Sequence, residues 1–174
     1  MKQATQIKDV FLRYLILVAA ALPNLYLFYL IFTPLTIYVI YFLLDLFMDV
    51  SLVGNSIIFS GCTSIEIIGA CVAGSAYYLL LILNLSVPKI KLKQRIQMIA
   101  FAFSSLFLLN IIRILILSLL LVSNSPIFDA THKIFWYALS TIFVVGLWFY
   151  EVKLFKIKSI PIYSDLKFLF KLKK

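Results

Sequence analysis

The chain has 174 residues, of which 64% are hydrophobic and only 13% are charged. Such a composition excludes an ordinary soluble fold and indicates a polytopic membrane protein. The formal net charge of +9 comes from basic residues that stand beside apolar runs. This arrangement is typical of the cytoplasmic membrane surface rather than of nucleic-acid binding, so no nucleic-acid partner is expected. Two cysteines are too few for a disulfide scaffold or a cysteine zinc site.

Hydropathy predicts an all-α membrane protein, a helical bundle of about five transmembrane segments. The whole chain, 1–174, is expected to form this single domain, with no room for a separate soluble one. Pro34 separates the first two spans, which form a tight pair. In chain order, the expected spans are residues 12–32, 34–47, 71–87, 98–122 and 132–152, followed by a basic tail, 153–174.

Loop charges predict the orientation of these spans. Basic residues fill the connection between the third and fourth spans and the tail after the fifth, so both are expected in the cytoplasm. The connections 49–70 and 123–131 contain no Lys or Arg and are expected to face outward. Five spans then place the N-terminus outside, although its own basic residues favour the inside: Lys2, Lys8 and Arg13. A re-entrant hairpin bent at Pro23 and Asn24 would remove this conflict, and the sequence leaves both alternatives open.

The outward connection between the second and third spans contains a β-rich segment. Residues 51–68 are rich in Val, Ile, Phe and Ser, with Gly54-Asn55 and Gly61 as turn signals. This pattern predicts a short outer β-hairpin or flap. A poorly ordered loop is the alternative.

Cys71 stands where this outer connection enters the third span, at an expected helix start. Backbone N–H groups and the helix dipole favour a thiolate at such a position. The small residues Gly74 and Ser75 allow close approach of another helix or of a substrate backbone. Cys71 is therefore the candidate nucleophile, and a plain packing role is the alternative. Cys62, on the flap, is a competing nucleophile or a disulfide partner of Cys71.

Arg113 lies inside the apolar run 98–122, where a cation costs at least a few kcal/mol and its default interpretation is functional. With the fourth span running outward, Arg113 is expected in the outer half of the membrane. Its fork of donors can stabilise a thiolate, hold a substrate carbonyl or meet an oxyanion. Asn110, one turn earlier, can orient the guanidinium or bind substrate backbone. The alternative is a structural ion pair with an acidic side chain, either Asp45 or Glu66.

His132 is the only histidine of the chain and opens the fifth span after an outward connection. It is therefore expected at the same membrane face as Cys71, and a Cys and His pair fits nucleophilic acyl transfer. Asp129, three residues earlier, can orient the ring, or it is a solvated loop acid. A histidine in this position can also be incidental.

Three short stretches in this order resemble the exosortase and archaeosortase family of integral-membrane cysteine transpeptidases: IEIIGACVAGSA at 65–76, LNIIRI at 109–114 and THKIFWY at 131–137. The resemblance covers residues 35–148 and implies that Cys71 is the nucleophile, Arg113 its arginine partner and His132 the third catalytic residue. The chain differs from larger members by its short length and its brief loop before His132.

The resemblance further implies an enzyme of protein sorting in the plasma membrane, with its active site on the extracytoplasmic side. Its partners would be secreted proteins with a C-terminal signal, made of a short motif, a transmembrane helix and a basic cluster. Cleavage would be followed by transfer to an acceptor such as a membrane lipid. No metal or organic cofactor is expected, because the chain supplies the nucleophile. Alternatives are a membrane hydrolase without transfer and a non-enzymatic helical scaffold or small transporter.

Overall fold

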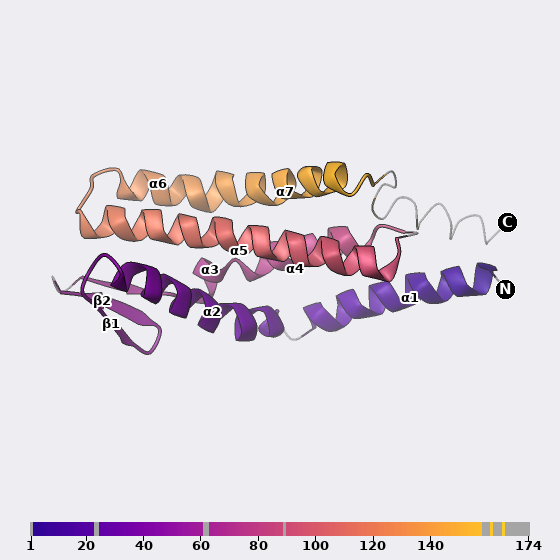
Figure 1. The fold of residues 1–174 in the computed structure, drawn as a ribbon, viewed down its shortest axis with the longest axis horizontal. Helices are drawn as coiled ribbons and strands as arrows, with labels where there is room; N and C mark the ends of the chain where they lie inside the picture. Colours follow the sequence, from indigo (N-terminus) through magenta and orange to yellow (C-terminus); the bar gives the residue numbers. More distant parts are fainter. Residues whose placement is uncertain are drawn as a thin grey trace.

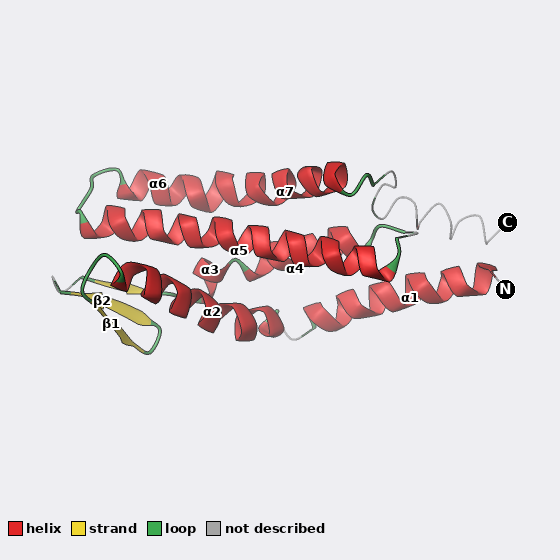
Figure 2. Cartoon of the chain, in the orientation of Figure 1, coloured by secondary structure: helices red, strands yellow, loops and turns green. Residues whose placement is uncertain are grey.

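The computed structural model describes residues 2–22, 25–60, 63–88, 90–157, 161 and 165, and of residues 2–6 and 138–140 it describes the backbone alone. The fold is mostly helical, with one small sheet, as predicted (Figure 2). In chain order the elements are α1 (Lys2–Ala21), α2 (Tyr26–Asp45), β1 (Val50–Val53), β2 (Ser56–Phe59), β3 (Ser64–Glu66), α3 (Gly69–Val72), α4 (Gly74–Leu85), α5 (Leu92–Val122), α6 (Phe128–Ile134), the π-helical turn η1 (Phe135–Leu139) and α7 (Ser140–Leu154).

Helix α5 is the central element of the bundle, and it contacts α2, α3, α4, α6 and α7. Its 31 residues begin at Leu92, six residues before the predicted span 98–122, and end at Val122 as predicted. At about 1.5 Å per residue it is about 46 Å long. Helices α6 and α7 lie along one side of it, and α2 and the sheet lie on the other (Figure 1).

The division of the N-terminal apolar region differs from the predicted spans 12–32 and 34–47. The chain breaks near Leu25, which has a positive φ of 60°, and Pro34 lies inside α2 rather than at a boundary. Proline removes one helical hydrogen bond, but α2 continues because one face is held by burial on both sides of Pro34. The buried residues on this face are Phe28, Thr36, Ile37, Ile40 and Leu44.

Helices α1 and α2 follow one another in the same direction along the bundle instead of folding back as a hairpin (Figure 1). The proposed bend residues Pro23 and Asn24 lie outside the described residues. As a result, the start of α1, the α4–α5 connection and the end of α7 all lie at one end of the molecule. The sheet and the α5–α6 connection lie at the other end (Figure 1).

Among the described residues, two helices are long and apolar enough to cross a membrane, α2 and α5. A third is added if α6, η1 and α7, which bend by 47°, are taken as one span in place of the predicted 132–152. The predicted span 71–87 corresponds to the apolar segment Gly69–Leu85, which is shorter than α2 and α5 and is broken into α3 and α4. Apolar helices of this length are typical of a membrane protein. The full count of five spans stays a prediction.

The predicted flap is a three-stranded antiparallel sheet in the order β1-β2-β3. Gly54 and Asn55 form the β1–β2 turn, and Gly54 has the positive φ of 61° that favours glycine. The side chains of Ile57 and Phe59 are buried against α2 and α5 in one hydrophobic cluster, which also includes Ile67. This packing fixes the sheet against the bundle.

Candidate active site

Cys71 lies in α3, a single helical turn that ends abruptly at Ala73. Ala73 has left-handed backbone angles, φ 59° and ψ 39°, and α4 starts anew at Gly74. Left-handed conformation is unfavourable for a residue with a Cβ atom and often marks a functional position. We call residues 69–74 the elbow. The Cys71 thiol is free and partly buried.

The elbow weakens the prediction that a helix start stabilises a thiolate at Cys71. The backbone N–H of Cys71 already donates to the carbonyl of Ile68 at 2.9 Å, and α3 has only four residues. A helix this short offers little dipole to stabilise a thiolate. Stabilisation of charge at Cys71 must therefore come from neighbouring side chains.

Two side chains of α5 provide that neighbourhood, on the face predicted from their spacing. Asn110 Nδ2 donates a 2.8 Å hydrogen bond to the backbone carbonyl of Cys71. The guanidinium of Arg113 lies close enough to Cys71 for an electrostatic interaction between them. Both α5 side chains are almost fully buried, with exposed fractions of 4% and 6%. The structure therefore brings three of the predicted site residues together.

The alternative ion pair of Arg113 is absent from the described part of the chain. Asp45 and Glu66 are both exposed, and the ion pairs found among the described residues belong to Arg13. Moreover, Arg113 Nε is buried without a hydrogen-bond partner among these residues. A buried cation without a carboxylate is costly. An anion formed at Cys71 would offset this cost.

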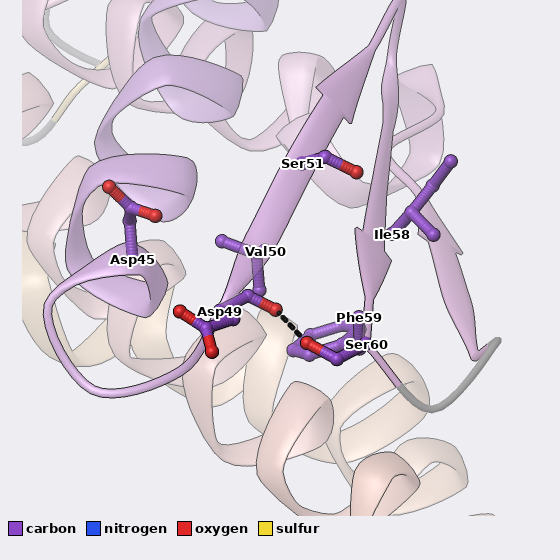
Figure 3. Close-up of a pocket in the computed structure, with 7 residues that line it drawn as sticks. All are labelled: Asp45, Asp49, Val50, Ser51, Ile58, Phe59 and Ser60. Carbon is purple, nitrogen blue, oxygen red and sulfur yellow. Dashed lines mark hydrogen bonds between the residues drawn. The ribbon is translucent and has the colours of Figure 1, made fainter.

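Asp45 contributes instead to an open pocket of about 440 Å³ between the end of α2 and strands β1 and β2 (Figure 3). Figure 3 shows its carboxylate and that of Asp49 at one side of this pocket, and Ser60 Oγ donating to the backbone carbonyl of Asp49 at 2.8 Å. Neither Cys71 nor Arg113 lines this pocket. The lining residues are Asp45, Asp49, Val50, Ser51, Ile58, Phe59 and Ser60.

Gly74 does not provide open space beside Cys71, because it is buried against Tyr29. A Cβ atom on Gly74 would lie 2.8 Å from two ring atoms of Tyr29, and one on Gly69 would lie 3.4 Å from the same ring. Tyr29 of α2 therefore packs on both ends of the elbow, and Gly74 serves this packing. Ser75 is exposed. Sequence reasoning missed Tyr29, although the two glycines around Cys71 signalled close approach by another element.

His132 lies on α6, apart from these three residues. It is exposed, and its ring stacks on Phe128 at 5.8 Å and meets Trp136 edge-on at 6.3 Å. Within the described part of the chain its ring makes no hydrogen bond to Cys71, Arg113 or Asp129. Asp129 is also exposed, in the first turn of α6. The structure therefore joins neither of these two residues to the Cys71 cluster.

The position of His132 along the long axis of the bundle explains this separation. Arg113 lies nine residues before the end of α5, about 14 Å from it, whereas His132 lies four residues after the start of α6, about 6 Å from that helix end. Helix α6 packs against α5 beside this end. The ring of His132 therefore lies nearer the end of the bundle than the guanidinium does.

Cys62, the competing nucleophile, lies outside the described residues. In comparisons with known proteins, no family model, no curated protein and no solved structure matches the chain. The candidate site consequently rests on the geometry of Cys71, Asn110 and Arg113. These residues supply a free thiol, a buried cation and an amide that fixes the backbone of the thiol residue.

A second polar cluster lies at the opposite end of α4 and has a structural explanation. Arg95 donates to the carbonyls of Asn84, Leu85 and Val87 at 3.0 to 3.1 Å. Arg13 donates to the same Leu85 carbonyl at 2.7 Å and forms a two-bond ion pair with Asp165. Carbonyls at a helix C-terminus lack partners within the helix, and cations satisfy them. These arginines were predicted only as cytoplasmic surface charge.

Proposed function

We propose that this protein is a membrane-embedded cysteine transpeptidase of the exosortase and archaeosortase type. It would cleave a C-terminal sorting signal of secreted proteins and transfer the acyl group to an acceptor, such as a membrane lipid. The observation that carries this proposal is Arg113, a buried guanidinium beside a free cysteine, without a carboxylate partner among the described residues. In such a setting the natural counter-ion is the thiolate, and later the oxyanion.

In the proposed first step, the thiolate of Cys71 attacks the scissile carbonyl and forms a carbon–sulfur bond. The carbonyl electron pair moves to oxygen, and Arg113 stabilises this oxyanion. Collapse of the tetrahedral intermediate breaks the carbon–nitrogen bond, and the leaving amine takes a proton from His132. The product of this step is a thioester on Cys71.

In the second step, His132 accepts a proton from the acceptor hydroxyl or amine, which attacks the thioester and releases the thiolate. This role needs contact with the leaving group and the acceptor, not with the thiol. Catalytic hydrogen bonds also often form only once substrate is bound. The separation of His132 from Cys71 is therefore compatible with the proposed chemistry.

The dimensions of α5 support a site near one membrane surface. A helix of about 46 Å exceeds a hydrocarbon core of about 30 Å, so about 8 Å would extend beyond each side if the helix were centred. Arg113, about 14 Å from the helix end, would then lie about 6 Å inside the core. A guanidinium at that depth can reach a peptide bond held at the interface.

The basic segments support the orientation of the proposed enzyme. If the end that holds the start of α1, the α4–α5 connection and the end of α7 is cytoplasmic, the positive-inside rule holds for all three. The N-terminal charges then agree with the others if α1 and α2, which run in one direction, together cross the membrane once, and this would give four crossings instead of the predicted five. The sheet and Cys71 would face the extracytoplasmic side of the plasma membrane.

The decisive test compares membrane proteins of native cells that carry the wild type or Cys71→Ala. We expect secreted precursors to accumulate with an uncleaved C-terminal helix in the Cys71→Ala strain, at normal levels of the variant, and Cys62→Ala to process normally. The reverse pattern would move the nucleophile to Cys62. Mass spectrometry of the mature product distinguishes a lipid adduct, which transfer predicts, from a free carboxylate, which would favour a hydrolase.

A further inference from the structure

Strand β3 is an edge strand of the sheet, a few residues upstream of the proposed nucleophile. It pairs with β2 on one side, and among the described residues no strand pairs with its other side. Natural sheets limit pairing at such edges with very short strands, charged side chains, proline, a bulge or a covering segment. Strand β3 has only three residues and one charged side chain, Glu66, but neither lysine nor proline, and its Ser64 and Glu66 are exposed, so its main chain can still accept a short added strand.

The register of the sheet shows which backbone groups this edge presents. Phe59 N–H donates to the Thr63 carbonyl at 2.9 Å, and Ile67 N–H donates to the Asn55 carbonyl at 3.0 Å. In an antiparallel ladder the direction of the backbone groups alternates along the strand. Odd-numbered residues from 63 to 67 therefore face β2, whereas Ser64, Glu66 and Ile68 present their N–H groups to the open side.

The extended backbone continues from this edge to the elbow. Ile68 has φ −93° and ψ 168°, so the chain remains strand-like up to Gly69. Ile68, Gly69 and Ala70 are exposed, and the carbonyl of Ile68 accepts the N–H of Cys71. Exposed residues therefore alternate with covered ones from Ser64 to Ile68, because Ile65 is half-buried and Ile67 is buried, and three exposed residues then lead to Cys71.

We propose that the substrate segment beside the scissile bond binds as an extended strand on the open edge of β3, paired with Ser64, Glu66 and Ile68. This inference rests on the proposed function and names the conformation in which that site takes its substrate. An added strand satisfies its main chain through the edge, as in other cases of β-augmentation. Pairing through Ile68 brings the bound peptide to the elbow, where the Cys71 thiol can reach its carbonyl.

The edge also explains why a peptide, rather than lipid, is the fitting occupant. Backbone N–H groups exposed to hydrocarbon cost several kcal/mol each, so this edge must meet water or polypeptide. A peptide strand offers acceptors at the spacing of every second residue, about 6.6 Å, which matches the outward groups of β3. Affinity would then come from main-chain bonds, and specificity from side chains near Cys71.

Glu66→Pro removes one outward N–H without removing a bond to β2, and proline is tolerated on such an edge. Glu66→Ala is the matched control, because it removes the carboxylate but keeps the N–H. We expect Glu66→Pro to slow cleavage of the precursor that accumulates in the Cys71→Ala strain by about tenfold, the worth of one hydrogen bond. Glu66→Ala should cleave at nearly the wild-type rate.

Alkylation of Cys71 by iodoacetamide shows whether each variant keeps a folded site, and we expect equal rates for wild type, Glu66→Pro and Glu66→Ala. If Cys71 of the Glu66→Pro variant is alkylated at an abnormal rate, substitutions in the substrate test the strand pairing instead. Prolines placed one at a time in the precursor, upstream of its cleavage site, should block cleavage at every second position, because alternate N–H groups face β3.

Two results would overturn the inference. Normal cleavage by a folded Glu66→Pro variant excludes pairing at this edge, and so does a proline series without the two-residue alternation. Absence of any precursor in the Cys71→Ala strain is a different failure, because it removes the proposed function itself and this inference with it. If cleavage still depends on Cys71 but the proline series shows no alternation, the proposed enzyme activity stands and only the proposal of an added substrate strand is excluded.

Discussion

The side-chain amide of Asn110 on α5 donates a 2.8 Å hydrogen bond to the backbone carbonyl of Cys71. This bond ties the short helix α3 to the longest helix of the bundle, across 39 positions of sequence. The two elements also contact each other directly. The carbonyl cannot satisfy itself within a four-residue helix, so the amide replaces a missing helical partner.

Replacing Asn110 with Leu should therefore remove the hydrogen bond that holds the elbow, residues 69–74, against α5. The partly buried carbonyl of Cys71 would lose its partner, at a cost of about 1–3 kcal/mol in the free energy of unfolding. We expect precursor cleavage to fall by more than this stability loss explains, because the thiol would lose its fixed position. Cleavage rate and thermal unfolding in detergent are the measurements.

Ser118→Ala is the matched control for Asn110→Leu. Ser118 is equally buried on α5, and its hydroxyl donates to the carbonyl of Ile114 within the same helix. Its loss should leave cleavage near the wild-type rate. Equal loss of cleavage in both variants would show that the effect of Asn110 is general to α5 and does not act through Cys71.

Replacing Arg113 with Met should abolish cleavage while the protein remains folded. The buried cation has no carboxylate partner among the described residues, so its removal relieves a desolvation cost instead of stranding an opposite charge. We expect equal or higher thermal stability. An unfolded Arg113→Met protein would instead support a structural role for this residue.

Replacing Gly74 with Ala should destabilise the fold through one contact. The new Cβ atom would lie 2.8 Å from Tyr29, closer than real contacts allow, so the ring must move. Overpacking of this kind costs about 1–3 kcal/mol. Adding Tyr29→Ala should recover part of that loss, and a double-mutant cycle measures the coupling between the two positions.

Gly146→Ala on α7 provides the control for this substitution. Nothing lies within 4 Å of a Cβ atom at Gly146, so the same chemical change meets open space. Alanine in a helix interior should be neutral or stabilising, by up to about 1 kcal/mol. Additive behaviour of Gly74→Ala and Tyr29→Ala would contradict the assigned contact.

The sequence predicted the features that depend on composition and spacing. Arg113 was conspicuous as a cation in an apolar run, and Asn110 shares its helix face because three residues make almost one turn. The β-rich segment 51–68 contained its own turn signals, and the structure has strands there. The end of α5 at Val122 also agreed with the hydropathy pattern.

The features that were missed depend on tertiary contacts. Pro34 was expected to end a helix, but burial of Ile37, Ile40 and neighbouring side chains outweighs the lost hydrogen bond. The break at Ala73 gives no signal in sequence, because alanine favours helix and rarely has positive φ. Tyr29 is one of ten tyrosines, and only its position against Gly69 and Gly74 distinguishes it.

The buried ion pair between Arg13 and Asp165 is expected to stabilise the fold. Both side chains are buried, and two hydrogen bonds of 3.0 Å join the guanidinium to the carboxylate. Asp165→Asn would leave the buried guanidinium without its buried counter-ion, which costs about 3–5 kcal/mol. Asp9→Asn removes the other acidic partner of Arg13. The side chain of Asp9 is 53% exposed, and ion pairs with an exposed partner contribute only about 0–1 kcal/mol. Thermal unfolding in detergent should therefore show a large loss for Asp165→Asn and a small one for Asp9→Asn. Equal losses would mean that solvent reaches both pairs alike.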